Sequence, residues 1–244
     1  TFRFEDDARI GQFAQRCVQR PFNISHTAAT LIDSGEFSGS ALIPHAKSGL
    51  ASAARRLILK ELTPYIDLLK QGPNSSETEQ MFHQKLLERF HTFRILCAHR
   101  KGEYGVEQMN ELVSGIVKQL SENQSADEHW YGRPIMVRRN DKTTGRFNGD
   151  IGLVVARRME DGSNLPTIVF PSNTTGEGNS VAYIAPALLP AHETAFAMTI
   201  HKSQGSEFKH AMLIFPKQLS PILTRELIYT GVTRAKEQIT LLSN

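Results

Sequence analysis

Apolar residues recur at helical spacing, with polar residues between them, in several segments of this chain. The segments predict helices at residues 10–18, 50–69, 81–90, 106–120 and 224–238. Pro64 falls inside the second segment, where it predicts a break or the start of a new helix. The segment at 106–120 has the clearest amphipathic pattern, whereas residues 21–48 and 71–79 are rich in polar and turn-forming residues and predict loops.

Short apolar runs bounded by turn residues predict strands. They lie at residues 93–98, 134–138, 151–156, 167–170, 180–184, 195–200, 211–215 and 239–242. The first run leads through Gly102 and Gly105 into the helix at 106–120, and this order of strand, turn and helix is the unit of an α/β sheet. Four runs follow one another between 134 and 184 without a helix, which predicts a small β-barrel inserted into an α/β domain.

Composition adds limits rather than a function. The net charge of +3, from 28 Lys and Arg against 25 Asp and Glu, is too small to predict a nucleic-acid partner, so that argument must rest on local charge. Cys17 and Cys97 are too few for a disulfide framework, and their apolar surroundings predict buried free thiols. With no run of about 18 apolar residues and no signal peptide, we expect a cytoplasmic protein without a membrane span. Because the chain starts at Thr1, as if in mid-fold, we expect a piece of a longer protein.

A dense polar turn, HKSQGSE at residues 201–207, follows the strand predicted at 195–200. Turns at the carboxyl ends of strands are where α/β sheets bind ligands. Hydroxyl, amide and backbone N–H groups can donate to phosphate oxygens there, and His201 or Lys202 can add positive charge. The alternative interpretation is a solvated loop with a helix cap.

A second candidate lies in the helix predicted at 224–238, where residues 229–236 read YTGVTRAK. Arg234 lies one turn after Thr230, and its planar, permanently charged guanidinium suits a transferring phosphoryl group. A surface arginine on an amphipathic helix is the alternative. Arg3 lies between two phenylalanines and carries no information on its own.

Together these segments resemble the superfamily 1 DNA helicases, and most closely the exodeoxyribonuclease V alpha-chain (RecD-like) family. Residues 201–208 resemble motif V, residues 229–236 resemble motif VI, and Phe2-Arg3 resembles the aromatic–arginine pair of motif IV. Segments typical of the family are matched by residues 96–110 (LCAHRKGEYGVEQMN), 130–134 (WYGRP) and 147–152 (FNGDIG). The matches follow the family's order along almost the whole chain, although residues 21–90 match weakly.

The resemblance implies the C-terminal motor half of a helicase, which is the second RecA-like domain, with a P-loop NTPase-like parallel sheet and an inserted SH3-like β-barrel. It assigns residues 1–130 and 193–244 to the motor domain and 131–192 to the barrel. The sequence has no phosphate-binding loop of the pattern GxxxxGK[ST]. We therefore expect ATP and Mg²⁺ to be bound mainly by a missing N-terminal motor domain, and this piece alone to be inactive.

Carried over residue by residue, the resemblance makes Arg3 and Arg234 arginine fingers that face the γ-phosphate across the cleft between two motor domains. Gly205 and Glu207 are expected near the nucleotide. Contacts to the DNA backbone, or the coupling of DNA to the cleft, are expected from Thr199, His201, Lys202 and Ser203. The insertion adds a basic patch that could follow a DNA backbone or could be a solvated face, formed by Arg133, Arg138, Arg139, Lys142 and Arg146.

For the whole protein the resemblance implies an ATP-dependent 5′–3′ DNA helicase subunit of exodeoxyribonuclease V, acting in double-strand break repair and recombination. Its expected partners are single-stranded DNA and the beta and gamma chains. Three rival interpretations stay open to different degrees. A nucleic-acid-binding module without a motor explains the basic patch but leaves Arg234 without a role, a nuclease lacks clustered acidic residues, and a subunit-contact scaffold could use residues 21–90.

Overall fold

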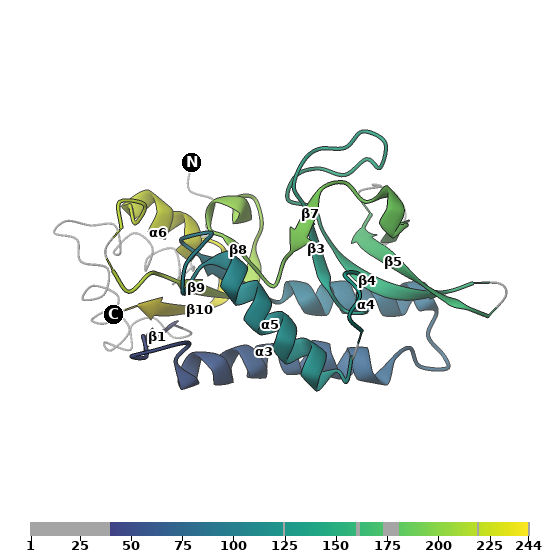
Figure 1. Ribbon diagram of the computed structural model, residues 1–244, viewed down its shortest axis with the longest axis horizontal. Coiled ribbons are helices and arrows are strands. Elements are labelled where there is room, and N and C mark those ends of the chain that lie inside the picture. Colours follow the sequence, from purple (N-terminus) through teal and green to yellow (C-terminus); the bar gives the residue numbers. More distant parts are fainter. Residues whose placement is uncertain (1–39, 124, 160–161, 173–180, 219, 244) are drawn as a thin grey trace. The chain divides into compact units, whose positions relative to one another are not determined.

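The computed structural model describes residues 40–123, 125–159, 162–172, 181–218 and 220–243. Within these ranges the chain forms two five-stranded sheets, one parallel and one antiparallel (Figure 1). The expectation of an α/β fold with a parallel sheet is confirmed. The helix predicted at 10–18, together with Cys17 and Arg3, lies outside the described residues.

The parallel sheet has the strand order β1-β10-β9-β2-β8. Its strands are β1 (Ser40–Pro44), β2 (Phe93–Cys97), β8 (Ala197–Thr199), β9 (Phe208–Ile214) and β10 (Ala235–Ser243). Every residue of β2 is buried, as expected for a central strand of a parallel sheet, which is covered on both faces. Even Arg94 is buried there, with its guanidinium 5.2 Å from the ring centroid of Phe208.

The antiparallel sheet has the order β6-β5-β4-β3-β7. Its strands are β3 (Pro134–Val137), β4 (Ile151–Arg158), β5 (Asn164–Pro171), β6 (Val181–Ile184) and β7 (His192–Thr194). One face is closed by a cluster of Ile135, Val137, Val154, Ile168, Phe170 and Ile184. The four strands predicted between 134 and 184 are therefore present, and β7 adds a fifth because it pairs with β3.

Four helices complete the described structure, with two short 3-10 turns. They are α3 (Ser52–Gln71), α4 (Glu79–His91), α5 (Val106–Leu120), α6 (Arg225–Val232), η1 (Pro186–Leu188) and η2 (His201–Ser203). The chain divides into two compact units. Among the described residues, the first unit comprises those of 40–61, 92–109 and 197–243, and the second comprises those of 62–91 and 110–196.

The predicted break or new helix start at Pro64 is wrong. Helix α3 runs without interruption from Ser52 to Gln71. A proline in a helix interior removes one backbone hydrogen bond. Packing around it offsets this loss, since Leu62, Tyr65 and Ile66 are all buried. Tyr65 is fixed further by its hydroxyl, which donates to the Gly132 carbonyl at 2.7 Å.

Two other boundaries differ from those predicted. The segment 21–48 was expected to be loop, yet Ser40–Pro44 forms β1 by parallel pairing with β10. The helix predicted at 224–238 ends at Val232, and β10 already begins at Ala235. Pairing with β9 captures the residues after Val232, because the Phe208 N–H donates to the Arg234 carbonyl at 2.8 Å. Arg234 therefore lies just beyond α6 and not on the helix.

Candidate functional site

The five strands of the first sheet are parallel, so the segments that follow them leave from the same edge. The polar turn predicted as a site follows β8 directly, at residues 200–207. It is joined to the neighbouring strand, because the Ile200 N–H donates to the Cys97 carbonyl at the end of β2 (3.1 Å). The turn therefore starts from a fixed position at the carboxyl edge of the sheet, where α/β proteins bind ligands.

Hydrogen bonds within the turn set the orientation of its first residues. Thr199 Oγ1 accepts from the Lys202 N–H (3.3 Å), and the Ser203 hydroxyl donates to the Ile200 carbonyl (2.7 Å). Ser203 is fully buried, so its hydroxyl holds the turn together instead of facing solvent. His201 is exposed, and Thr199 and Lys202 are half-buried, so these side chains can reach a ligand, whereas that of Ser203 cannot.

Gly205 and Glu207 form the outer end of the turn. Gly205 has a φ of +87°, which favours glycine, and no atom lies within 4 Å of the place where a Cβ would be. Its backbone is therefore open to an approaching ligand. The Glu207 carboxylate lies 2.9 Å from Lys236 Nζ, and both side chains are more than half exposed.

Arg234 places its guanidinium on this turn. Nη1 donates to the Ser206 carbonyl (3.1 Å), Nε to the Thr230 carbonyl (3.0 Å), and Nη2 to Thr233 Oγ1 (3.1 Å). All three acceptors are neutral oxygens, and no carboxylate of the described ranges pairs with Arg234. A guanidinium has five N–H donors, so Arg234 keeps an uncompensated charge and further donors for an anion.

Gly231 allows α6 to lie close enough for this contact. A Cβ at Gly231 would lie 2.6 Å from Leu213 Cδ2 and 3.3 Å from Ile200 Cδ1, both on buried residues. The helix thus packs directly on β9 and on the start of the turn. Its N-terminus is capped by Thr224, whose side chain accepts from the Leu227 N–H at 3.2 Å.

The structure brings together several predicted residues and adds others. Arg234, Gly205 and Glu207 come from two segments that meet through Ser206. Ser206 was not assigned a role from the sequence, because its contribution is a backbone carbonyl, which no residue type reveals. The sequence pattern already places Arg234 one turn after Thr230, and the structure joins them through the Thr230 backbone carbonyl.

A second polar cluster lies at the same edge of the sheet, in the segments after β1, β2 and β9. Lys217 Nζ lies 3.1 Å from both Glu103 Oε1 and the Lys47 carbonyl, and the Gly49 N–H donates to Glu103 Oε1 (3.1 Å). The hydrogen bond from Lys217 holds the pKa of the Glu103 carboxyl below its ordinary value. These contacts tie the family-typical segment 96–110 to its neighbours.

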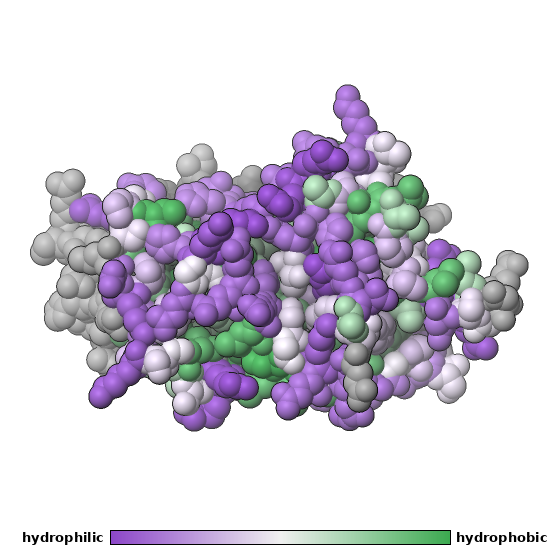
Figure 2. Space-filling model, viewed as in Figure 1, coloured by the Kyte–Doolittle hydropathy of each residue, from purple (hydrophilic) through white to green (hydrophobic). Residues whose placement is uncertain are grey.

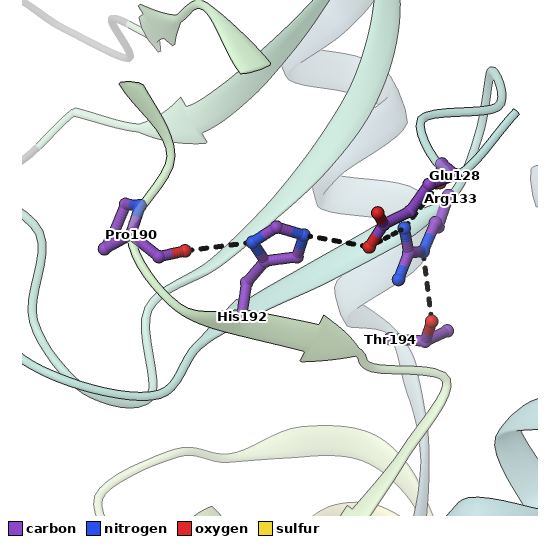
Figure 3. Close-up of polar contacts among 5 residues, drawn as sticks. All are labelled: Glu128, Arg133, Pro190, His192 and Thr194. Atoms are coloured by element: carbon purple, nitrogen blue, oxygen red, sulfur yellow. Dashed lines mark hydrogen bonds and ion pairs between the residues drawn. The ribbon is translucent and has the colours of Figure 1, made fainter. Parts of the chain in front are cut away.

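Arg133 was expected in the basic patch of the insertion, but its side chain is held within the second unit (Figure 3). Arg133 Nε donates to Thr194 Oγ1 at 3.0 Å, and Nη1 donates to the Glu128 carbonyl. The Glu128 carboxylate lies 3.4 Å from Arg133 Nη1 and 3.4 Å from His192 Nε2, while His192 Nδ1 donates to the Pro190 carbonyl (2.9 Å). Arg133 is therefore held against β7 and is not part of an exposed basic surface.

The other arginines of the predicted patch lie on the β3–β4 loop, defined here as residues 138–150. The Arg146 side chain is only 11% exposed, and its guanidinium lies 5.0 Å from the ring centroid of Phe170. Arg138 is about half exposed and lies 3.7 Å from the carboxylate of Glu193 on β7. Arg139 is exposed. Only part of the predicted patch thus faces solvent.

The described ranges contain no group of three or more His, Cys, Asp and Glu side chains placed to hold a metal ion. Cys97 is a buried free thiol as predicted, and burial raises its pKa. None of the helices in the part of the chain that the structure describes is long and apolar enough to cross a membrane.

Comparison with known proteins gives one family match in the segment that holds the candidate site, and several similar relatives. The UvrD-like helicase C-terminal domain family matches residues 194–242, which contain β8, the polar turn and Arg234. The RecBCD enzyme subunit RecD of Haemophilus influenzae is 37% identical over 183 residues, which are 73% of this chain and 26% of that protein. The corresponding subunit of Mycolicibacterium smegmatis is 38% identical over 146 residues, 60% of this chain and 24% of that protein. The chain thus spans about a quarter of the length of these relatives.

Among solved structures, the Pif1 helicase from Bacteroides, in complex with ADP-AlF3 and single-stranded DNA, matches with a TM-score of 0.37 and 20% identity. The match covers 76% of this chain and 48% of that one.

Proposed function

Because the chain belongs to the RecD-like superfamily 1 helicases, of which it forms the C-terminal region, we propose that it is the second motor domain of an ATP-dependent DNA helicase. In this proposal residues 1–130 and 193–244 form a RecA-like motor domain that contains the parallel sheet. Residues 131–192 form an inserted SH3-like β-barrel, to which the antiparallel sheet belongs.

One observation carries the proposal. The Arg234 guanidinium lies on the turn after β8, bonded to the Ser206 carbonyl at 3.1 Å and to no carboxylate of the described residues. A half-buried guanidinium whose acceptors are all neutral keeps a positive charge with which an anion can pair. A nucleotide γ-phosphate is such an anion, and a planar guanidinium can bond two of its oxygens at once.

The nucleotide side of the site fits the residues present. Arg234 supplies charge, Gly205 supplies open backbone, and Glu207, which is more than half exposed, is proposed to contact a ribose or orient an arginine. Helicases of this family use ATP, which supplies the phosphoryl group to be transferred to water, and Mg²⁺, which would neutralise the charge of its phosphate oxygens. We assign most of the ATP and Mg²⁺ contacts to an N-terminal motor domain. Arg3 is proposed as a second finger and lies outside the described residues.

The DNA side is assigned to the inner part of the same turn. We propose that Thr199, His201 and Lys202 contact the phosphate backbone, and that buried Ser203 couples this contact to the nucleotide side through the turn. Arg138 and Arg139 of the β3–β4 loop add backbone contacts from the insertion. Because one short turn serves both sides, occupation of one can change the geometry of the other.

For the whole protein we propose 5′–3′ helicase activity in the cytoplasm within an exodeoxyribonuclease V assembly, in double-strand break repair and recombination. The proposed partners are single-stranded DNA, the N-terminal motor domain and the beta and gamma chains. This chain alone is proposed to be inactive, because its sequence contains no phosphate-binding loop.

The test is DNA-stimulated ATP hydrolysis by the full-length protein, with wild type compared with Arg234→Ala and Arg234→Lys. Loss of an arginine finger should lower turnover by roughly 10³-fold or more, while ATP and DNA still bind. The lysine variant should rescue little, because an ammonium cannot bond two phosphate oxygens in a fixed plane.

Lys209→Ala is the matched control, since it removes an exposed positive charge on the same sheet. Circular dichroism of each variant confirms folding. If the folded Arg234→Ala protein hydrolyses ATP like the wild type, the motif VI assignment is wrong. A nucleic-acid-binding or subunit-contact role would then replace the motor.

A further inference from the structure

The β3–β4 loop is a rigid structure rather than a loose connection. The Asp141 and Arg146 backbones bond each other twice, at 2.8 and 3.1 Å, and Asp141 Oδ1 accepts from both the N–H and the hydroxyl of Thr144 (2.8 and 3.0 Å). The hydrogen bond from the Thr144 N–H holds the pKa of Asp141 below its ordinary value. Farther along, the Asn148 N–H donates to Asn140 Oδ1 at 2.8 Å. These bonds fix the shape of the loop backbone.

Phe147 is held at the surface by this framework. Its side chain is 56% exposed. Its N–H donates to Asp150 Oδ2 (3.0 Å), its carbonyl accepts from the Asp150 N–H (3.0 Å), and the Gly149 N–H donates to the Val137 carbonyl (2.9 Å). The backbone is thus fixed on both sides of Phe147, and the neighbouring Arg146 guanidinium lies over the ring of Phe170 in the core cluster.

The charges around Phe147 are predominantly positive. Arg139 and Lys142 are exposed, and neither forms an ion pair with a carboxylate within the described ranges. The two acidic residues of the loop, Asp141 and Asp150, accept backbone N–H groups of the loop itself. The loop reaches beyond the ends of β3 and β4 in Figure 1, and the same place in Figure 2 is a mainly hydrophilic projection.

We propose that the β3–β4 loop contacts single-stranded nucleic acid, with Phe147 stacked on a base and Arg139 and Lys142 on the flanking phosphates. An exposed ring beside exposed, positively charged side chains is the combination that binds single strands, because each base offers a flat face and each linkage a negative charge. In a duplex those faces are covered. A protein partner fits less well, since lysine is depleted in the centre of protein interfaces.

This inference rests on the proposed function for its ligand, a DNA single strand, but not on ATP or on Arg234. It adds a base contact to a domain whose other proposed contacts are all to phosphates. Such a contact depends on stacking and not on sequence, so it suits a protein that must bind any strand.

The experiment measures binding of fluorescein-labelled oligo(dT) to the full-length protein by anisotropy over a range of salt concentrations. Phe147→Ala should weaken binding roughly 5- to 100-fold, the loss expected for one stacked base, and Phe147→Trp should retain it. The slope of log affinity against log salt concentration should not change, because no phosphate contact is lost.

In the double variant Arg139→Ala/Lys142→Ala the magnitude of that negative slope should decrease by about 0.7 for each phosphate contact removed. Leu188→Ala, at an exposed apolar residue of the same unit, is the matched control and should bind like the wild type.

If wild type binds oligo(dT) with DNA-stimulated ATP turnover and Phe147→Ala binds equally well, the inference fails and the proposed function stands. The same conclusion follows if Leu188→Ala loses as much affinity as Phe147→Ala, or if Phe147→Ala impairs only assembly with other chains, which would identify a protein surface. If wild type neither binds oligo(dT) nor hydrolyses ATP in its presence, both proposals fail.

Discussion

Arg234 and Ser206 are separated by more than one element in the sequence, yet one hydrogen bond of 3.1 Å joins them. At the scale of single residues the candidate site depends on such short contacts. The sequence was sufficient to identify side chains that can bind phosphate, namely those of Arg234, His201 and Lys202. It could not identify the carbonyl of Ser206 or the buried state of Ser203, because both depend on backbone geometry that folding creates.

Gly231 provides a direct test of this geometry. Replacement by alanine puts a methyl group 2.6 Å from Leu213 Cδ2, inside a filled core, so Gly231→Ala should lower the free energy of unfolding by about 1–3 kcal/mol. Urea denaturation of the variant measures the change. Gly115→Ala is a matched control in α5, because no atom lies within 4 Å of its Cβ position, and it should raise stability by about 0.5–1 kcal/mol. Equal effects in the two variants would mean that α6 does not pack as closely as described.

His83 predicts how stability depends on pH. Its ring is buried and hydrogen-bonded to the Tyr183 hydroxyl at 3.0 Å, and desolvation lowers its pKa from the ordinary value of 6.5. As pH falls below that value, the unfolded chain binds a proton before the folded one does. The free energy of unfolding should therefore be unaffected by His83 above pH 6.5 and should decrease below it.

The measurement is urea unfolding at one pH above this range and one below it. His83→Gln should reduce the difference between the two without abolishing it, because burial also lowers the pKa of His45 and His210. An unchanged difference in the variant would show that His83 takes up its proton in the folded state as easily as in the unfolded chain.

At the scale of elements, the pattern of apolar and polar residues predicted most helices and strands. The residues at which they end were determined by pairing between strands that are distant in the sequence. The amphipathic segment 106–120 is helix α5 as expected, since its apolar stripe is buried. The residues after Val232 also look helical, but hydrogen bonds to β9 convert them into β10. Strands β1 and β7 were missed because each is short and only partly buried, so that partners distant in sequence define them.

Pro64 gives a prediction at this scale. An alanine there can donate a backbone hydrogen bond that proline cannot, and α3 is continuous through the position. Pro64→Ala should therefore raise the free energy of unfolding by about 1–3 kcal/mol, measured by thermal and urea denaturation. A loss of stability would instead indicate that the proline ring itself fills space that alanine leaves empty.

At the scale of the whole molecule, the order of strand, helix and strand-rich segments was enough to predict an α/β domain with a β-rich insertion. The polar groups of the insertion were less predictable. The spacing of Arg133 and Arg146 suggested a continuous basic surface, but Glu128 binds the first and Phe170 covers the second. Side-chain partners of this kind come from distant positions, so composition within a short stretch overestimates exposed charge.

The pairing of β2 with β8 has a consequence for how the chain reaches this structure. The two strands are neighbours in the sheet, with Ile95 opposite Ala197, yet residues 98–196 lie between them in the sequence. During synthesis almost a hundred further residues must therefore be added after β2 before its partner β8 leaves the ribosome. The entropy lost in closing such a long loop falls if the antiparallel sheet has already folded and drawn the two ends of the segment closer. Early folding of the insertion would thus favour the pairing of the last strands, and the turn after β8 and Arg234 before β10 depend on that pairing for their positions.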